Sequence, residues 1–176
     1  LPVTEMGLPG GSLGGYLNGH LGIFLGHGVD DSAAVNSLLE IAAMPELPEV
    51  ETVCRGLRPK LEGHVLASVI QRRPDLRFPI PPGFVDRLTG RRIERLQRRA
   101  KFILATMEDQ TVLIAHLGMS GRMTIHDETP PPAGPHDHVE FVTDEGCTVR
   151  FCDPRRFGLV DLTTLAELDQ HRMLRD

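Results

Sequence analysis

The amino-acid sequence predicts an α+β fold that is mainly β: a β-sandwich or flattened barrel with one helix packed on it near the start. Short apolar segments of strand type follow one another after residue 64, separated by turns rich in Gly, Pro and acidic residues. One segment with helical periodicity precedes them. Several short strands behind a single amphipathic helix are typical of a sandwich or barrel that packs against that helix.

The first 44 residues form a glycine-rich extension. They contain nine of the 18 glycines, no Lys or Arg, and only a weak helical pattern over 31–44. Without basic residues, the segment lacks the positive n-region of a signal peptide and the Arg-rich face of a mitochondrial transit peptide. We expect residues 1–44 to be disordered, or to result from a mis-assigned start of the reading frame.

A helix is predicted from residue 48 to about residue 58. Pro48 suits its first position, where a missing N–H needs no partner, and Glu49 and Glu51 complement the positive end of the helix dipole. Pro59 predicts that the helix ends near Arg58, because the residue before a proline avoids the α region. One face is apolar through residues at helical spacing: Val50, Val53, Cys54, Leu57 and Leu61.

The strands are predicted from alternation and from turn residues. Residues 64–73 alternate, with Val65, Ala67 and Val69 on one side. Two hairpins follow: residues 100–119, turning at 108–110, and residues 138–153, turning at 144–146. The other segments are proline-rich loops at 77–83 and 128–135, and a second helix that begins within 162–176 and is not completed.

Composition excludes several classes of protein. A length of 176 residues corresponds to one domain with room for a core, and 40% apolar and 24% charged residues are ordinary for a globular chain. The three cysteines are odd in number and have no C-x-x-C spacing, which argues against a disulfide framework or a complete zinc site. No apolar run approaches the roughly 18 residues that span a bilayer. We therefore expect a reduced intracellular protein with no membrane partner.

The net charge of −5 conceals an uneven distribution of charge. Residues 52–101 carry thirteen Lys or Arg against four acidic residues, whereas residues 1–44 carry acidic residues only. The excess predicts a basic face on a nominally acidic protein. A solvated face without any partner is the alternative.

Four short motifs carry candidate chemistry: PELPEVETV at 45–53, QRRAKFIL at 97–104, HLGMSGRM at 116–123 and DPRRFG at 153–158. In this order, and with HDHVEF at 136–141, they resemble the formamidopyrimidine-DNA glycosylase family of base-excision repair enzymes. The resemblance runs from Met44 nearly to the end of the chain. It implies a bifunctional DNA glycosylase and AP lyase that removes oxidised purines such as 8-oxoguanine and formamidopyrimidines.

The resemblance implies three catalytic residues. Pro45 would be the mature N-terminus, whose secondary amine attacks the sugar C1′ and forms the Schiff base that leads to β,δ-elimination. An internal proline cannot do this, because its nitrogen lone pair is delocalised into the peptide bond, so Met44 is expected to be a removed initiator. Glu46 would be the general acid, and Lys101 would contact the lesion nucleotide and donate a proton. The structural alternatives are a helix-leading proline, a carboxylate at a helix start and one more surface cation.

Four further residues are implied to bind DNA. Met119, at a glycine-flanked tip, would fill the gap left when the damaged nucleotide leaves the duplex. Arg155 would hydrogen-bond the orphaned partner base, Phe157 would wedge the stack, and His136 would contact a phosphate. The structural alternatives are a methionine folded into the core, a surface arginine and a buried strand phenylalanine.

The resemblance also divides the chain. Residues 1–44 are the extension, 45–162 the catalytic N-terminal domain, and 163–176 the start of a helix or linker to a missing C-terminal half. That half would hold a helix–two-turn–helix domain and a zinc finger with one structural zinc, and no cofactor or metal ligand is expected in the present chain. The implied partner is double-stranded DNA with oxidised bases, bound by a monomer in the bacterial cytoplasm at the nucleoid. We expect weak DNA binding and poor activity without the second half.

Two alternatives stay open. If residues 1–44 block Pro45 permanently, the chain would be a non-catalytic damaged-DNA-binding module. An endonuclease VIII-like enzyme would instead act on oxidised pyrimidines, although that branch usually has glycine where this chain has Leu47.

Overall fold

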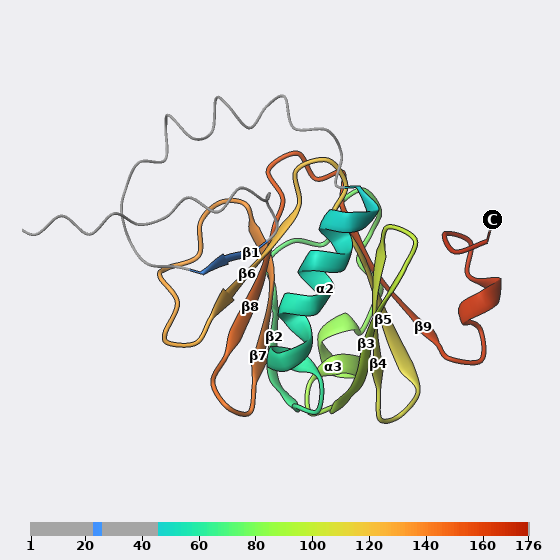
Figure 1. Ribbon diagram of the computed structural model, residues 1–176, viewed down its shortest axis with the longest axis horizontal. Coiled ribbons are helices and arrows are strands. Elements are labelled where there is room, and N and C mark those ends of the chain that lie inside the picture. Colours follow the sequence, from blue (N-terminus) through green and yellow to red (C-terminus); the bar gives the residue numbers. More distant parts are fainter. Residues whose placement is uncertain (1–22, 26–45, 176) are drawn as a thin grey trace, which may run out of the picture.

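A computed structural model of the chain describes residues 23–25 and 46–175, which form two β-sheets with a helix along the side where the sheets meet (Figure 1). The elements in chain order are β1 (Ile23–Leu25), α2 (Leu47–Leu61), β2 (Leu66–Gln71), α3 (Phe84–Leu88), β3 (Ile93–Arg99), β4 (Phe102–Met107), β5 (Thr111–His116), β6 (Arg122–His126), β7 (Asp137–Thr143), β8 (Thr148–Cys152), β9 (Leu159–Thr164) and the 3-10 helix η1 (Leu168–Gln170).

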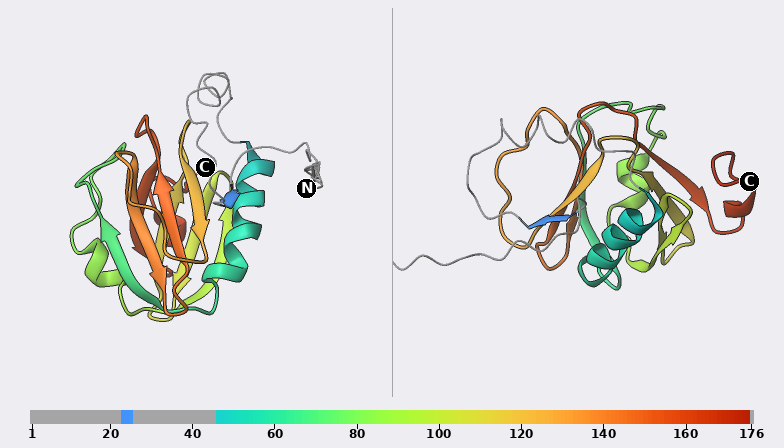
Figure 2. Two further views of the ribbon diagram at one scale, coloured as in Figure 1. Left: turned by 90° about the vertical axis from the view of Figure 1, so that its left-hand side faces the viewer. Right: turned by 45° about the horizontal axis from the view of Figure 1, so that its top comes forward.

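The strands pair into a five-stranded sheet with the order β1-β6-β8-β7-β2 and a four-stranded sheet with the order β3-β4-β5-β9. All of these pairings are antiparallel except that of β1 with β6. The two sheets face each other, and α2 covers one side of the sandwich (Figure 2). The predicted fold class, a mainly β sandwich with a helix packed near its start, is therefore confirmed.

The core lies between the two sheets and the inner face of α2. The apolar face predicted for this helix is confirmed, because all five of its residues are buried: Val50, Val53, Cys54, Leu57 and Leu61. They pack with inward-facing strand residues such as Met123, Phe141 and Phe151 in one apolar cluster. Burial of this area from water is the main force that holds the helix on the sheets.

Both predicted hairpins are confirmed. Strands β4 and β5 pair around residues 108–110, with Gln110 at a φ of 69°, and strands β7 and β8 pair around residues 144–146, with Gly146 at a φ of 82°. Strands β3, β6 and β9 lie in segments for which the sequence predicted no strand. In β3 only Ile93 and Leu96 are buried, so the cations around them conceal the strand pattern.

The end of α2 differs from the prediction. The helix continues through Pro59 to Leu61, and the N–H of Glu62 still donates to the carbonyl of Arg58 at 2.9 Å. A proline within a helix removes one backbone hydrogen bond, which is a local loss. Leu57 and Leu61 lie on either side of Pro59 and are buried at 1% and 6% exposure, so their packing offsets that loss.

The face assignment of β2 was also wrong. Ala67 is exposed, whereas Leu66 and Val69 are buried. A β-bulge between Leu66 and Ser68 shifts the pairing with β7 and inserts one extra residue, so strict alternation fails at this point.

The last segment does not form the helix predicted within 162–176. Strand β9 extends to Thr164, and only the short 3-10 helix η1 follows. Leu168 and Leu174 are buried in a second apolar cluster, and Arg99 donates to the Asp169 carboxylate at 2.7 Å. The residues that the sequence pattern assigned to a helix instead form strand pairs and these contacts.

In the extension, the structure describes only β1, a strand that the sequence did not predict. Ile23 lies opposite Met123 in parallel pairing with β6. The expectation of disorder for the rest of residues 1–44, and the position of Pro45, lie outside the described residues.

Glu51 links α2 to β3 and supports a pH-dependent prediction. Its carboxylate accepts hydrogen bonds from Arg98 Nε at 2.9 Å and Arg55 Nε at 3.2 Å. The hydrogen bond from Arg98 is the main cause that lowers the pKa of Glu51 below its ordinary value of 4.5. A carboxyl group with a lowered folded-state pKa stabilises the fold above its unfolded-state pKa, and this contribution is lost as the pH falls through the folded-state pKa.

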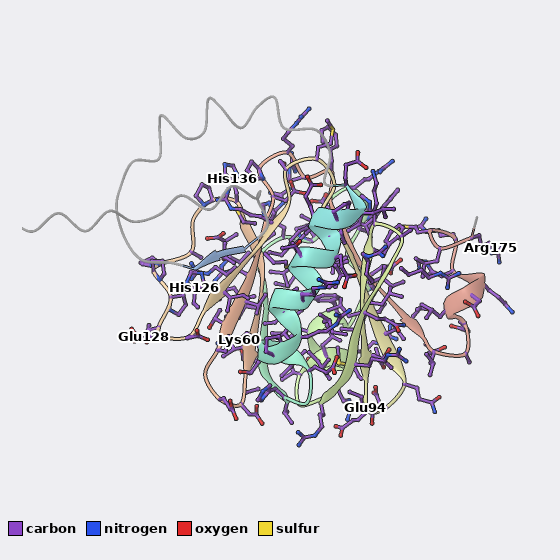
Figure 3. All side chains as sticks on the ribbon, viewed as in Figure 1. Lys60, Glu94, His126, Glu128, His136 and Arg175 are labelled. Carbon is purple, nitrogen blue, oxygen red and sulfur yellow. The ribbon has the colours of Figure 1, made fainter. Side chains whose placement is uncertain are left out.

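Glu51→Gln is therefore expected to lower the urea midpoint of unfolding at pH 7, with the difference from the unaltered protein shrinking below about pH 4.5. Urea titrations at several pH values measure this. Glu94→Gln, on the solvent side of β3 at the far end from the candidate site (Figure 3), is the matched control. A difference that stays constant down to pH 3 would show that the Glu51 charge does not contribute.

Candidate active site and nucleic-acid interface

The candidate site lies at the end of the sandwich that is at the top of Figure 1. The first turn of α2, the β5–β6 loop and the β8–β9 loop all reach this end (Figures 1 and 2). Six of the seven residues predicted to act on DNA come from these segments, from the tight β3–β4 turn and from the end of the β6–β7 loop, whereas Pro45 lies outside the described residues. Segments that are far apart in the sequence are thus brought to one edge of the fold.

Glu46 immediately precedes α2 as its N-cap residue. Its backbone N–H donates to the Glu49 carboxylate, and its carbonyl accepts from the N–H of Val50 at 3.1 Å. The backbone of Glu46 is therefore held at both ends, while its side chain is 60% exposed. Pro45, the predicted nucleophile, is the residue bonded to Glu46 but lies outside the described residues.

Lys101 lies beside Glu46. Residues 100 and 101 connect β3 to β4, and Ala100 adopts a φ of 50°, which closes the turn and presents the lysine. Lys101 Nζ is 3.5 Å from Glu46 Oε2. Because both side chains are partly exposed, the pair adds little to folding stability. The structure therefore brings two of the predicted catalytic side chains together where stability does not require it.

His116 completes this cluster, although the sequence analysis did not select it. Its Nδ1 accepts a hydrogen bond from the N–H of Gly118 at 2.9 Å, and its ring packs 4.9 Å from that of Phe102. Burial, and then the charges of Arg77 and Lys101, lower the pKa of His116. The imidazole is thus neutral at pH 7 and carries its hydrogen on Nε2, where it can donate. The sequence signal that could have identified His116 is its position as the first residue of the motif HLGMSGRM.

Met119 lies on the β5–β6 loop, and Arg155 and Phe157 lie on the β8–β9 loop, which contacts it. Met119 is 40% exposed at the tip of the β5–β6 loop, and Phe157 is 43% exposed in the β8–β9 loop. The guanidinium carbon of Arg155 lies 5.0 Å from the centre of the Phe157 ring. Five large apolar side chains are exposed among the described residues, and Met119 and Phe157 are the two that lie on loops in contact with each other, which favours a surface that binds a partner.

His136 is exposed just before β7 (Figure 3), and its carbonyl accepts from the N–H of Asp153 at 3.0 Å, which ties it to the β8–β9 loop. His138 is buried, and its Nε2 lies 2.8 Å from the Asp153 carbonyl. Of the two histidines in HDHVEF, only His136 is accessible to a ligand.

The predicted basic face is smaller than the sequence suggests. Most of the thirteen cations in residues 52–101 form ion pairs, which are those of Arg55, Arg58, Lys60, Arg72, Arg73, Arg91, Arg98, Arg99 and Lys101. Arg98, for example, is committed to Glu51. At the candidate site, Arg77 and Arg155 are exposed, whereas the other cations of residues 52–101 outside this set, which are Arg87, Arg92 and Arg95, are exposed on or next to α3 and β3.

The comparisons with known proteins identify the family. The sequence matches the family model described as "Formamidopyrimidine-DNA glycosylase N-terminal domain" over residues 44–160. The chain belongs to the formamidopyrimidine-DNA glycosylase family. All seven predicted site residues lie inside the range that matches this family.

Relatives in the formamidopyrimidine-DNA glycosylase family are closely similar in sequence. The enzyme of that name from Ruegeria pomeroyi is 52% identical over 140 residues, covering 74% of this chain and 49% of its own length. The one from Acidiphilium cryptum is 53% identical over 131 residues, covering 74% and 46%. The chain therefore spans about half the length of the relatives it matches.

Solved structures of the formamidopyrimidine-DNA glycosylase family agree with the fold. The Lactococcus lactis enzyme bound non-covalently to DNA containing an AP site superposes with a TM-score of 0.64 at 29% identity, covering 70% of this chain and 46% of that chain. A mutant of the same enzyme in complex with DNA containing Fapy-dG gives 0.64 at 31% identity, covering 70% and 45%.

The cysteines of this glycosylase-family domain are buried thiols. Burial raises the pKa values of Cys54 and Cys152 to about 11, so both are protonated at neutral pH. Within residues 46–175, no three His, Cys, Asp or Glu side chains are placed to hold a metal ion together. In the same part of the chain, no helix is long and apolar enough to span a membrane.

Proposed function

We propose that this chain is the catalytic N-terminal part of a monomeric, bifunctional DNA glycosylase and AP lyase that removes oxidised purines from double-stranded DNA. The observation that carries the proposal is the 3.5 Å contact between Glu46 and Lys101. Glu46 directly follows Pro45 in the chain, and the pair lies at the same end of the fold as the exposed side chains of Met119 and Phe157. The names of its relatives, and the AP-site and Fapy-dG DNA bound by the Lactococcus lactis enzyme, support it.

The proposed chemistry begins with a free Pro45 amine. An α-amino group titrates near about 8, so a usable fraction is unprotonated at neutral pH. Its nitrogen attacks the sugar C1′, the bond from C1′ to the base breaks, and the base leaves with a proton supplied by the protein. Opening of the sugar ring then gives an iminium that joins Pro45 to C1′. This cation accepts electrons when C2′ loses a proton and the 3′ phosphate departs, and the 5′ phosphate leaves in the second elimination.

Glu46 and Lys101 are the proposed proton carriers in these steps. Glu46 lies next to the nucleophile in the chain and has a partly exposed carboxyl group that can deliver a proton to the sugar oxygen or the base. The Lys101 ammonium is close enough to return a proton to that carboxylate. It also places a positive charge where the phosphates that flank the damaged nucleotide would lie.

The exposed loop residues are proposed to hold the opened duplex. A base inside the stack is inaccessible to an amine, so the damaged nucleotide must swing out before attack. Met119 and Phe157 have the exposure and apolar character of side chains that enter a base stack. Arg155, beside Phe157, can donate hydrogen bonds to the unpaired partner base, and His136 can contact a phosphate.

The substrate class is tested with duplexes that carry one defined lesion. The natural protein is expected to excise 8-oxoguanine and ring-opened formamidopyrimidine at least about tenfold faster than 5-hydroxyuracil, as a difference of about 1.4 kcal/mol in transition-state binding gives. Single-turnover excision rates on a matched set of oligonucleotides measure this. A preference for the oxidised pyrimidine would instead support the endonuclease VIII-like alternative.

A second candidate is a non-catalytic module that binds damaged DNA. It is favoured by the 44 residues that precede Pro45, since an acylated proline nitrogen is not nucleophilic. Binding to lesion-containing duplexes without any base release, by the natural protein, would support this candidate over the enzyme.

A further inference from the structure

Asp153 is a buried carboxylate beneath the loops of the candidate site. It is 0% exposed, and among the ion pairs of the described residues none involves it. Its Oδ1 accepts a hydrogen bond from Ser120 Oγ at 2.6 Å, and its Oδ2 accepts from the N–H of Gly158 at 2.8 Å. A buried carboxylate that lacks a cationic partner depends on such donors, so its geometry is strongly fixed.

Ser120 connects the two loops through one hydroxyl group. The hydroxyl donates to Asp153, and its oxygen accepts from the backbone N–H of Arg155 at 3.1 Å. Ser120 follows Met119 directly in the β5–β6 loop, whereas Asp153 and Arg155 begin the β8–β9 loop. The hydroxyl therefore joins the segment that carries Met119 to the segment that carries Arg155 and Phe157.

The same two loops are in direct backbone contact. A Cβ atom on Gly118 would lie 2.4 Å from the nitrogen of Gly158 and 2.5 Å from the carbonyl carbon of Phe157. Gly118 also has a φ of 64°, which favours glycine. The loops thus meet without space for a side chain, and the Ser120–Asp153 contact fixes how they meet.

The exposed side chains themselves have little to hold them. Met119 is 40% exposed and Phe157 is 43% exposed, so packing alone does not define their relative position. A pair of side chains that enters a base stack must be ordered beforehand, because ordering them at the moment of binding reduces affinity.

We propose that Ser120 and Asp153 are positioning residues: their hydrogen bond holds Met119 and the Arg155–Phe157 pair at the fixed spacing needed to enter the duplex together. This inference rests on the proposed function and deepens it. The hydroxyl acts on opening of the duplex and does not touch the reacting atoms. Its loss therefore slows reactions that require a base pair to be opened and leaves the Pro45 chemistry itself intact.

The test compares Ser120→Ala with Ser120→Thr, which keeps the hydroxyl, and with Ser68→Ala on β2 as a control away from the site. Each variant is made in the protein with a free Pro45 amine, and thermal unfolding verifies that each is folded. Two substrates are used: a duplex with one 8-oxoguanine, and a single-stranded oligonucleotide with one abasic site. Covalent trapping on the second substrate requires the amine but no base-pair opening.

Ser120→Ala is expected to slow single-turnover excision from the duplex by about 10- to 100-fold, the range that misplacement by about 1 Å produces. Trapping on the single strand is expected to stay within about twofold, and Ser120→Thr is expected to recover most of the duplex rate. Equal losses on both substrates, no loss on the duplex, or no recovery with threonine would overturn the inference. If the unaltered protein traps neither substrate, the proposed function fails and this inference fails with it.

Discussion

A form of the protein that begins at Pro45 is expected to be trapped on oxidised DNA by borohydride, whereas the 176-residue form is expected to give no trapped complex. The reason is the state of one nitrogen atom. In the chain of 176 residues this nitrogen is part of a planar amide, whose lone pair is delocalised onto the carbonyl. As a chain terminus it is a secondary amine, which can attack C1′ and form an iminium that borohydride reduces to a stable bond.

Denaturing gels after borohydride treatment measure the covalent complex, and mass spectrometry of the linked peptide identifies the attached residue. The matched control is the form that begins at Pro45 with its amine acetylated, which restores the amide without restoring the extension. That control is expected to behave like the 176-residue form. Efficient trapping by the 176-residue form would refute the role of Pro45 as nucleophile.

The N-terminus of the natural protein distinguishes the enzyme from the non-catalytic module. A mass that begins at Pro45 supports the enzyme, and a mass that retains residues 1–44 supports the non-catalytic DNA-binding module. Whether the peptide bond between Met44 and Pro45 is cleaved therefore decides between the two functions.

The features that were predicted correctly depend on local sequence. The two hairpins follow from apolar segments around short turns, and the buried face of α2 follows from the spacing of Val50 through Leu61. The proximity of Glu46 and Lys101 could not be derived from spacing, because 54 residues separate them. It was implied only by the resemblance of their motifs to a family.

The features that were missed depend on partners distant in sequence. Strand β3 carries too many cations to show alternation, but pairing with β4 holds it in a sheet. Pro59 stays inside α2 because Leu57 and Leu61 are buried on both sides of it. The bond between Ser120 and Asp153 joins residues 33 positions apart, and neither residue type alone predicts such a contact.

The second large effect is expected at the Glu46–Lys101 pair. Glu46→Gln keeps the size of the side chain but removes the group that can donate a proton, and a positioned general acid contributes about 10²- to 10⁴-fold. The start of α2 is expected to survive, because the backbone of Glu46 still bonds to Glu49 and Val50, and a Gln side chain keeps an oxygen that can accept from the Glu49 N–H in the capping box. Base excision is therefore expected to fall by about 10²-fold or more without a change in thermal stability.

Lys101→Met tests whether the 3.5 Å contact is functional. Residues that act together in one proton-transfer step show non-additive effects when both are changed, whereas independent residues show additive ones. The double variant is therefore expected to lose little more activity than the more impaired single variant, in single-turnover excision assays. If the two losses multiply, Glu46 and Lys101 act in separate steps, and their contact does not transfer a proton between them.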